Sequence, residues 1–267
     1  MFDSHCHLQM RAFSRDRLSV WERACKAGLE GAIVIGMDVQ TSGQAIEIAE
    51  QFSDVYASVG LHPHDAKLLD DEAMRSLREL AGQPEIVAIG ETGLDFYRNL
   101  SPKEDQFQAF KWQLALAAEL DLPIVVHERE ARRETFAVLR DWAPGRKASL
   151  AKGPIGVMHC FAGDAALAQE YIALGFMISI AGNVTYPNAY RQQSVATDTP
   201  LDWLVLETDA PYLPPEGRRG RRNEPSLLRE TVDFVAGLRR ISHERLAEAT
   251  TTNARRLFRL DSREAQA

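Results

Sequence analysis

Short apolar runs alternate along the chain with amphipathic stretches, from the first residues to about residue 258. Apolar runs of this length are typical of buried strands, whereas the stretches between them repeat their apolar residues with the period of a helix. This alternation predicts βαβ units around a parallel sheet. Eight candidate strands lie near residues 1–6, 31–36, 55–61, 86–90, 123–127, 155–159, 176–181 and 203–207.

The amphipathic stretches predict helices, two of them after the last strand. They include 15–28, 42–53, 103–120, 164–174, 224–238 and 243–258. Ser101, Pro102 and Glu104 fit an N-cap, a first-turn proline and a capping-box acid. Eight units predict a (β/α)8 TIM-type barrel, and the helix over 243–258 is an additional C-terminal helix. A doubly wound open sheet is the alternative, although it concentrates its site at one switch point.

Imidazoles and carboxylates repeatedly follow the candidate strands, at or just beyond the end of each apolar run. Because a barrel brings the carboxyl ends of all its strands to one face, we expect these side chains to meet there. Polar groups after at least six strands favour a closed ring and predict a metal site assembled from many strands. The residues are His5, His7, His62, His64, Glu91, His127, His159 and Asp209.

The first of these positions form a His-X-His pair. The period of a strand places the His5 and His7 imidazoles on one side and Cys6 on the other, so that both rings can bind one cation. Glu91 stands between two nearby glycines, which allow the backbone to approach a neighbour closely. Its carboxylate can bridge two cations, and an ordinary loop acid is the alternative.

His127 and His159 each end a candidate strand. A lone histidine there is usually a satisfied core residue, but two of them together with Glu91 indicate a second cation site. Asp209 follows the last strand, where we expect it to bind the first cation and accept the proton of the attacking water. We expect Glu207 to be buried and hydrogen-bonded.

His62 and His64 remain after two cation sites are filled. They could be further ligands or packing residues, but imidazoles at the mouth of a metal cleft suit contact with a substrate oxygen. Pro63 between them stiffens the turn. Asp95 fits direct ligation and support of a ligand equally well, and His243 is assigned no role.

The proposed ligands define a class of chemistry. Two cations that share Glu91 would polarise an electrophilic oxygen and hold a bridging hydroxide at neutral pH, which fits hydrolysis of a phosphodiester, an amide or an ester. Imidazole and carboxylate ligands suit Zn, Mn, Fe and Co, and Mg to a lesser degree. The sequence contains no glycine-rich nucleotide loop in a strand-to-helix context and no GxSxG nucleophile elbow.

The composition of the chain indicates its number of domains and its cellular compartment. The 267 residues are 45% apolar, and α/β barrels of this length are routinely single domains. Three cysteines without a close pair argue against disulfides and for a reducing compartment, so we expect a cytoplasmic protein. We expect no signal peptide and no membrane span, because no apolar segment approaches about 18 residues. We also expect a monomer.

The net charge of −7 argues against passive binding of nucleic acid over the whole surface. It still allows an enzyme that meets phosphates in a local cleft. Four arginines lie within 217–222, shortly after Asp209, and a solvated loop is the alternative interpretation of this stretch. Arg129 and Arg98 are further candidates for phosphate contact.

With these motifs in place, the sequence resembles the TatD family of metal-dependent deoxyribonucleases, within the amidohydrolase superfamily. The resemblance implies one hydrolase domain over residues 1–267. The family pattern does not explain the stretch 144–153, which looks like a small insertion before the sixth strand. The matching segments occur in family order, and they are Asp3–Leu8, Gly60–His64, Gly90–Phe96, Val126–Arg129, His159–Phe161, Glu207–Leu213, Arg222–Pro225 and Thr252–Phe258.

The resemblance also implies two divalent metal ions per subunit that share Glu91. The remaining ligands would be His5, His7 and Asp209 for one ion, and His127 and His159 for the other.

The family's common activity makes a phosphodiesterase acting on DNA the leading hypothesis, as a 3′→5′ exonuclease on single strands or 3′ ends. His62 would contact the scissile phosphate, and His64, Arg129 and Arg222 would be further substrate-binding residues. The alternative is an amidase, deaminase or deacylase on the same scaffold, for example acting on aminoacylated tRNA. Amidohydrolases bridged by a modified lysine would have Lys in place of Glu91, which counts against that subtype. A non-catalytic binding protein stabilised by metal is disfavoured by the complete ligand set.

Overall fold

The architecture was obtained as a computed structural model, which describes residues 1–146, 149 and 151–261. Part of the predicted insertion 144–153 therefore lies outside the described residues. Eight parallel strands form one sheet in which each strand pairs with its neighbours in sequence. The strands are β1 (Phe2–Cys6), β2 (Gly31–Ile35), β3 (Val55–Val59), β4 (Ile86–Asp95), β5 (Ile124–Arg129), β6 (Gly156–Met158), β7 (Phe176–Ile180) and β8 (Leu204–Leu206).

The chain just beyond β8 returns to β1 and brings the sheet close to a complete ring. The backbone N–H of Asp209 donates to the carbonyl oxygen of His5 at 2.9 Å, and the N–H of His7 donates to Ala210 at 2.8 Å. The Ser4 hydroxyl donates to the carbonyl oxygen of Leu206 at 3.0 Å. The predicted barrel is confirmed, and its closure places Asp209 beside both histidines of β1.

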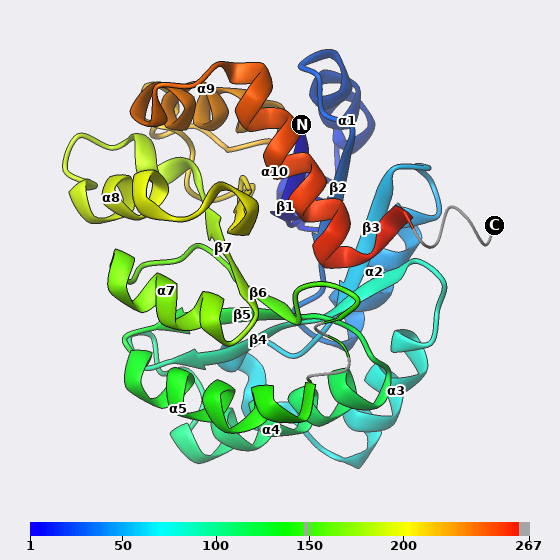
Figure 1. Cartoon of the computed structure of the whole chain (residues 1–267). Coiled ribbons are helices and arrows are strands. Elements are labelled where there is room, and N and C mark those ends of the chain that lie inside the picture. The colour runs from blue at the N-terminus through cyan, green and yellow to red at the C-terminus, as the bar shows by residue number, and fades with distance from the viewer. Residues whose placement is uncertain (147–148, 150, 262–267) are drawn as a thin grey trace.

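Helices surround the strands, as Figure 1 shows. Among the described residues, no helix is long and apolar enough to cross a membrane. The helices are α1 (Arg17–Lys26), α2 (Val39–Ala49), α3 (Asp71–Ala81), α4 (Lys103–Glu119), α5 (Arg132–Trp142), α7 (Ala165–Ala173), α8 (Tyr190–Asp198), α9 (Leu228–Arg239) and α10 (His243–Phe258).

The additional C-terminal helix α10 covers the amino ends of the strands. Leu257 and Phe258 pack in one buried cluster with Phe2 and the inward-facing apolar residues of the other strands. The Asn253 amide donates to the carbonyl oxygen of Leu204, at the start of β8, at 2.8 Å. Figure 1 shows α10, coloured orange to red, in front of β1. With this end of the barrel covered, the carboxyl ends of the strands remain available for a site.

The start of α4 differs from the prediction. Helix α4 begins at Lys103 with Pro102 as its N-cap, and no side chain caps it, so the capping role expected for Ser101 is wrong. The Ser101 hydroxyl instead donates to the carbonyl oxygen of His64 at 2.7 Å and accepts the N–H of Lys67 at 3.2 Å. These bonds tie the loop after β3 to the start of α4.

Strand β4 continues beyond the predicted end at residue 90, because two glycines let it pass close to β5. Gly90 and Gly93 have φ angles of +128° and +144°. A Cβ atom would lie 2.4 Å from the Val125 carbonyl oxygen at the first position and 2.0 Å from the His127 carbonyl oxygen at the second. Only glycine permits these conformations without strain. The close approach places Glu91 beside β5.

The described part of the segment 144–153 forms ion pairs and a hydrogen bond with Asp121, which precedes β5. The Lys152 ammonium lies 2.6 Å from one Asp121 oxygen, and the Ser149 hydroxyl donates to the other. The buried Arg146 guanidinium lies 3.3 Å from the same carboxylate. Because Asp121 stands at the amino end of β5, this segment belongs to the end of the barrel opposite the strand carboxyl ends.

Candidate metal centre

Seven of the predicted site residues meet at the carboxyl ends of the strands. Several elements supply them: β1, the loop after β3, β4, β5, and the segments that follow β6 and β8. All are buried or partly buried, so the groups are largely shielded from water. The residues brought together are His5, His7, His62, Glu91, His127, His159 and Asp209.

One group of donor atoms surrounds Oε2 of Glu91. The Nε2 atoms of His5 and His7 are 3.2 Å apart and lie 3.4 and 3.8 Å from Oε2. Oδ1 of Asp209 lies 3.8 Å from His5 and 3.4 Å from His7. A tetrahedral ion with bonds of about 2.1 Å separates its donors by about 3.4 Å. The spacing of His5, His7 and Glu91 therefore fits one divalent cation. Asp209 forms an adjoining group of possible ligands with His5 and His159.

A second group surrounds the other oxygen of the same carboxylate. Oε1 of Glu91 lies 2.8 Å from Nδ1 of His127 and 3.4 Å from Nε2 of both His159 and His62. The ring of His159 also stacks on that of His5, with centroids 3.7 Å apart, so the two groups are contiguous. The two oxygens of Glu91 thus face two different sets of imidazole nitrogens.

For His7 and His127, a contact to the other ring nitrogen determines which atom the imidazole offers. Nδ1 of His7 lies 3.2 Å from the Ile35 carbonyl oxygen, which leaves Nε2 free as a ligand atom. Nε2 of His127 lies 3.2 Å from Oδ2 of Asp95, which leaves Nδ1 free. His64 shares that oxygen through Nε2 at 2.8 Å. Carboxylates and carbonyls commonly orient metal-binding histidines in this way. These contacts favour the supporting role for Asp95 over direct ligation.

His62 has the opposite arrangement. Its Nδ1 accepts the backbone N–H of His64 at 3.2 Å. Burial lowers the pKa of His62 to about 4, so the ring is neutral at pH 7. A neutral imidazole carries one proton, which must then lie on Nε2 and point toward Glu91. Although its distance to Glu91 would suit a ligand, His62 is a hydrogen-bond donor in this geometry.

The ionisation of the centre suits a cation. Burial opposes the charge of Glu91, but the imidazoles of His159 and His62 hold its pKa well below the usual range. Burial likewise opposes the charge of Asp209, and its bond to His7 lowers its pKa. Despite burial, the carboxylates of Glu207 and Glu91 raise the pKa of His159 to about 10. A divalent cation is attracted by the same negative field and displaces such a proton.

Glu207 supports the second group from within the barrel. It is fully buried and accepts hydrogen bonds from the Cys160 backbone N–H at 2.7 Å and the Ser179 hydroxyl at 2.6 Å. Its Oε1 lies 3.0 Å from Nδ1 of His159. The predicted buried, hydrogen-bonding role of Glu207 is confirmed.

Sequence reasoning missed two supporting residues. Asp3 accepts both the N–H and the hydroxyl of Thr208, at 2.9 and 2.5 Å, and burial raises its pKa to about 7. The Gln113 amide on α4 accepts the N–H of Leu61 at 2.8 Å and donates to the Thr92 hydroxyl at 2.6 Å. The signal for Gln113 was a polar residue on the apolar face of a helix, where a buried amide needs partners.

The two predicted substrate-binding arginines have different environments. Arg129 is exposed, and its Cζ lies 3.9 Å from the centroid of the Tyr97 ring. Arg222 forms a bidentate salt bridge with Asp16, with nitrogen–oxygen distances of 2.8 and 2.7 Å. Arg129 thus keeps its charge available beside the centre, while that of Arg222 is already matched by a carboxylate.

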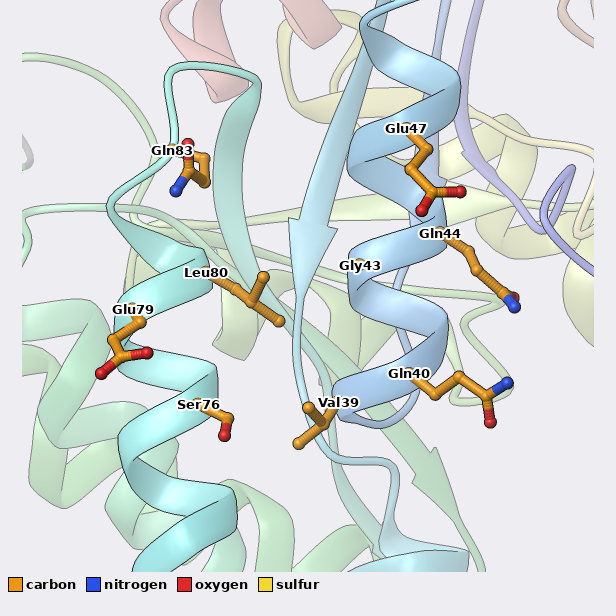
Figure 2. Close-up of a pocket in the computed structure, with 9 residues that line it drawn as sticks. All are labelled: Val39, Gln40, Gly43, Gln44, Glu47, Ser76, Glu79, Leu80 and Gln83. Atoms are coloured by element: carbon orange, nitrogen blue, oxygen red, sulfur yellow. The ribbon is translucent and has the colours of Figure 1, made fainter.

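A surface hollow lies elsewhere, between α2 and α3 (Figure 2). Its lining is mainly amide, hydroxyl and carboxylate side chains on the outer faces of these helices, such as Gln40, Gln44, Ser76 and Glu79. No predicted site residue lines it, so the chemistry of the chain is concentrated at the strand ends.

A (β/α)8 barrel with histidine and carboxylate donors at its strand ends defines a class, the metal-dependent hydrolases of barrel fold. Comparison with known proteins narrows the class to a family. Residues 2–259 match the family model described as TatD related DNase, and the chain belongs to this family.

The relatives cover nearly the whole chain. The "Uncharacterized metal-dependent hydrolase YabD" of Bacillus subtilis is 38% identical over 261 residues, which are 98% of this chain and 100% of the relative. The "3'-5' ssDNA/RNA exonuclease TatD" of Erwinia tasmaniensis is 42% identical over 268 residues, which are 97% and 100% of the two chains. The crystal structure of the TatD homologue YjjV from Escherichia coli matches with a TM-score of 0.89 and 31% identity over 97% of this chain and 98% of that one. The protein is a metal-dependent hydrolase.

Proposed function

We propose that this hydrolase is a deoxyribonuclease that cleaves phosphodiester bonds of DNA, as a 3′→5′ exonuclease on unpaired ends. The observation that carries the proposal is the Glu91 carboxylate, whose two oxygens face two separate donor groups. Two cations about a shared carboxylate are suited to displacement at phosphorus. Support for the substrate comes from the Erwinia relative, whose name specifies single-stranded DNA and RNA.

In this proposal each chain binds two divalent ions, with Glu91 common to both. Mixed imidazole and carboxylate ligands favour Zn, Mn, Fe or Co over Mg. When bound, such ions would polarise a phosphoryl oxygen and lower the pKa of a water molecule. The residues that would hold the first ion are His5, His7 and Asp209, and those for the second are His127 and His159.

Asp209 is the proton acceptor in this proposal. Its side chain is 13% exposed, against 3% for Glu91, so it is the carboxylate of the centre that is more open to water and substrate. Its lowered pKa keeps it ionised at pH 7. Asp209 takes the proton of the attacking water as the bond to phosphorus forms, and the proton then passes to the oxygen that leaves.

His62 supplies a hydrogen bond to the substrate. Its Nε2–H lies at the centre, and the His64 backbone N–H holds the ring in the tautomer that presents this proton. A donor aimed at a phosphoryl oxygen stabilises the charge that develops there during displacement. His64 keeps its Nε2 on Asp95, so Nδ1 is the atom with which it would meet a substrate.

The proposal is tested with metal-loaded protein and oligonucleotides labelled at one end, single-stranded or duplex, beside an aminoacylated RNA. We expect stepwise release of mononucleotides from the 3′ end of the single strand and slower cleavage of the duplex. A strand labelled at its 5′ end would then shorten gradually, whereas a 3′ label would be released at once in a mononucleotide. Intact DNA together with turnover of the acylated substrate would contradict the proposal and favour the deacylase alternative.

A further inference from the structure

Two exposed tyrosines lie in the loops that leave β4 and β8, beside the metal centre. The Tyr97 residue is 56% exposed and Tyr212 is 49% exposed, and both are among the most exposed large apolar side chains of the described residues. We propose that Tyr97, backed by Arg129, and Tyr212 are stacking platforms that bind the bases of an unpaired strand. The inference rests on the proposed nuclease function and assigns the residues that select its substrate.

Tyr97 is held close to the centre by its neighbours in sequence. The N–H of Phe96 donates to the Arg129 carbonyl oxygen at 2.9 Å, so the two strands are still paired at this point. Two residues before Tyr97, Asp95 contacts His127. The Arg129 guanidinium covers part of the Tyr97 ring, at 3.9 Å from its centroid, and more than half of the side chain still faces solvent. The pair therefore presents an open aromatic surface with a cation behind it.

Tyr212 flanks the centre from the other side of the ring. Its N–H donates to the carbonyl oxygen of Asp209 at 2.8 Å, and its ring centroid lies 6.2 Å from that of His7. A strand crossing the centre would thus meet one tyrosine on the side of β4 and the other on the side of β8.

Unpaired positive charge also lies beside Tyr97. Arg98 and Arg129 are exposed, and neither is paired with a carboxylate in the part of the chain that the structure describes. In the arginine stretch after β8, three of the four charges are matched, whereas Arg221 is exposed and has no carboxylate partner among the described residues. The pairs are Arg218 with Glu230, Arg219 with Glu216, and Arg222 with Asp16.

Aromatic faces beside unpaired cations are what a single strand requires. Its bases expose their π-faces, which stack on aromatic side chains regardless of sequence, while the cations attract the backbone. A duplex hides those faces between neighbouring base pairs, so it gains only the electrostatic attraction. The two platforms therefore predict a preference for unpaired DNA with little preference for sequence.

The test compares Tyr97→Ala and Tyr212→Ala with Tyr190→Ala, a matched control. Tyr190 is 75% exposed at the start of α8, and in the described residues no ring or cation lies against it. On a single-stranded oligonucleotide we expect KM to rise between about fivefold and a hundredfold in each platform variant, with kcat nearly unchanged, because each stacked base contributes that much to binding. Tyr97→Phe should restore the KM. An oligonucleotide that is abasic throughout keeps the phosphodiester bonds but offers no ring to stack, so its KM should be the same in all variants.

Substrates with abasic sites near the 3′ end separate stacking from structural damage. If a base stacks on Tyr97, an abasic site at its position weakens wild-type binding, and Tyr97→Ala adds no further loss on that substrate. Equal losses on intact and abasic strands would overturn the stacking role, as would a KM equal to that of the Tyr190 control. If wild type cleaves no DNA at all, the proposed function itself fails, which is a different result from cleavage that is insensitive to the tyrosines.

Discussion

Replacing Asp95 by alanine should empty one metal position and leave the other occupied. Asp95 touches none of the atoms proposed to bind the first ion. Its Oδ2 lies 3.2 Å from Nε2 of His127 and 2.8 Å from Nε2 of His64, and its Oδ1 accepts the N–H of Arg98 at 2.7 Å. Of these contacts, the one to His127 orients a proposed ligand of the second ion.

The expected magnitude follows from that one contact. Loss of a carboxylate that orients a metal-binding histidine usually lowers affinity by about 10- to 100-fold, or about 1.4 to 2.7 kcal/mol. Asp95→Asn keeps an acceptor oxygen for His127 but not its charge. Charged and neutral hydrogen bonds differ by about 1 kcal/mol, so the asparagine variant should lose only about fivefold. The first ion should bind within about twofold of wild type, because the Ile35 carbonyl orients His7 independently.

The assay is competition of each dialysed variant with a chelator of known affinity, which resolves two binding steps. Asp70→Ala is the matched control, because Asp70 is also a hydrogen-bonded loop aspartate: it caps α3 by accepting the Ala73 N–H at 2.8 Å, outside the metal centre. It should weaken the fold without changing either binding step. Unchanged affinity for the second ion in Asp95→Ala would refute the argument that Asp95 positions His127.

Three other predictions concern the base, the barrel end and the cations. Asp209→Asn at matched metal occupancy should slow DNA hydrolysis by at least about a hundredfold in a single-turnover assay, and turnover within about threefold of wild type would remove its role as base. Asp121→Asn should lower the free energy of unfolding in urea by about 2 kcal/mol at pH 7, because the buried Arg146 loses its carboxylate. Burial raises the pKa of Asp121, but neighbouring cations, above all Lys152, hold that pKa below its usual range. The difference in unfolding free energy between wild type and Asp121→Asn should therefore be complete above about pH 4 and shrink at lower pH. A difference that stays constant with pH would contradict the ion pairing of Asp121. Arg129→Gln should reduce the slope of log binding constant against log salt concentration by about 0.7 for a single strand, and Arg222→Gln should reduce it by much less. Equal changes would show that Arg222 contacts DNA in spite of its ion pair.

The fold could be predicted because its strands and helices carry separate periodic signals. Helix α10 has the predicted bounds, and the candidate strands agree with the observed ones except at their ends. The main difference is β4, which runs on to Asp95. Gly90 and Gly93 are usual loop residues, and their need for close approach to β5 depends on a neighbour that is distant in sequence.

The members of the centre could also be predicted, because each follows an apolar run that ends at the same face of the barrel. The orientation of the imidazole rings could not be predicted from the sequence. The Nδ1 atom of His62 accepts a backbone N–H, whereas Nε2 of His127 faces Asp95, and both contacts depend on the path of a loop or on register between strands. The pairing of Arg222 with Asp16 joins residues far apart in the sequence, which local patterns do not reveal.

If Glu91 binds two divalent ions at once, as proposed, the metal content per chain depends on its carboxylate. Elemental analysis of protein loaded with Zn or Mn and then dialysed should give two ions for wild type and one for His127→Ala. Glu91→Ala should lose both, because each of its carboxylate oxygens faces one donor group. Retention of two ions by a folded Glu91→Ala variant would show that Glu91 is not shared between two ions.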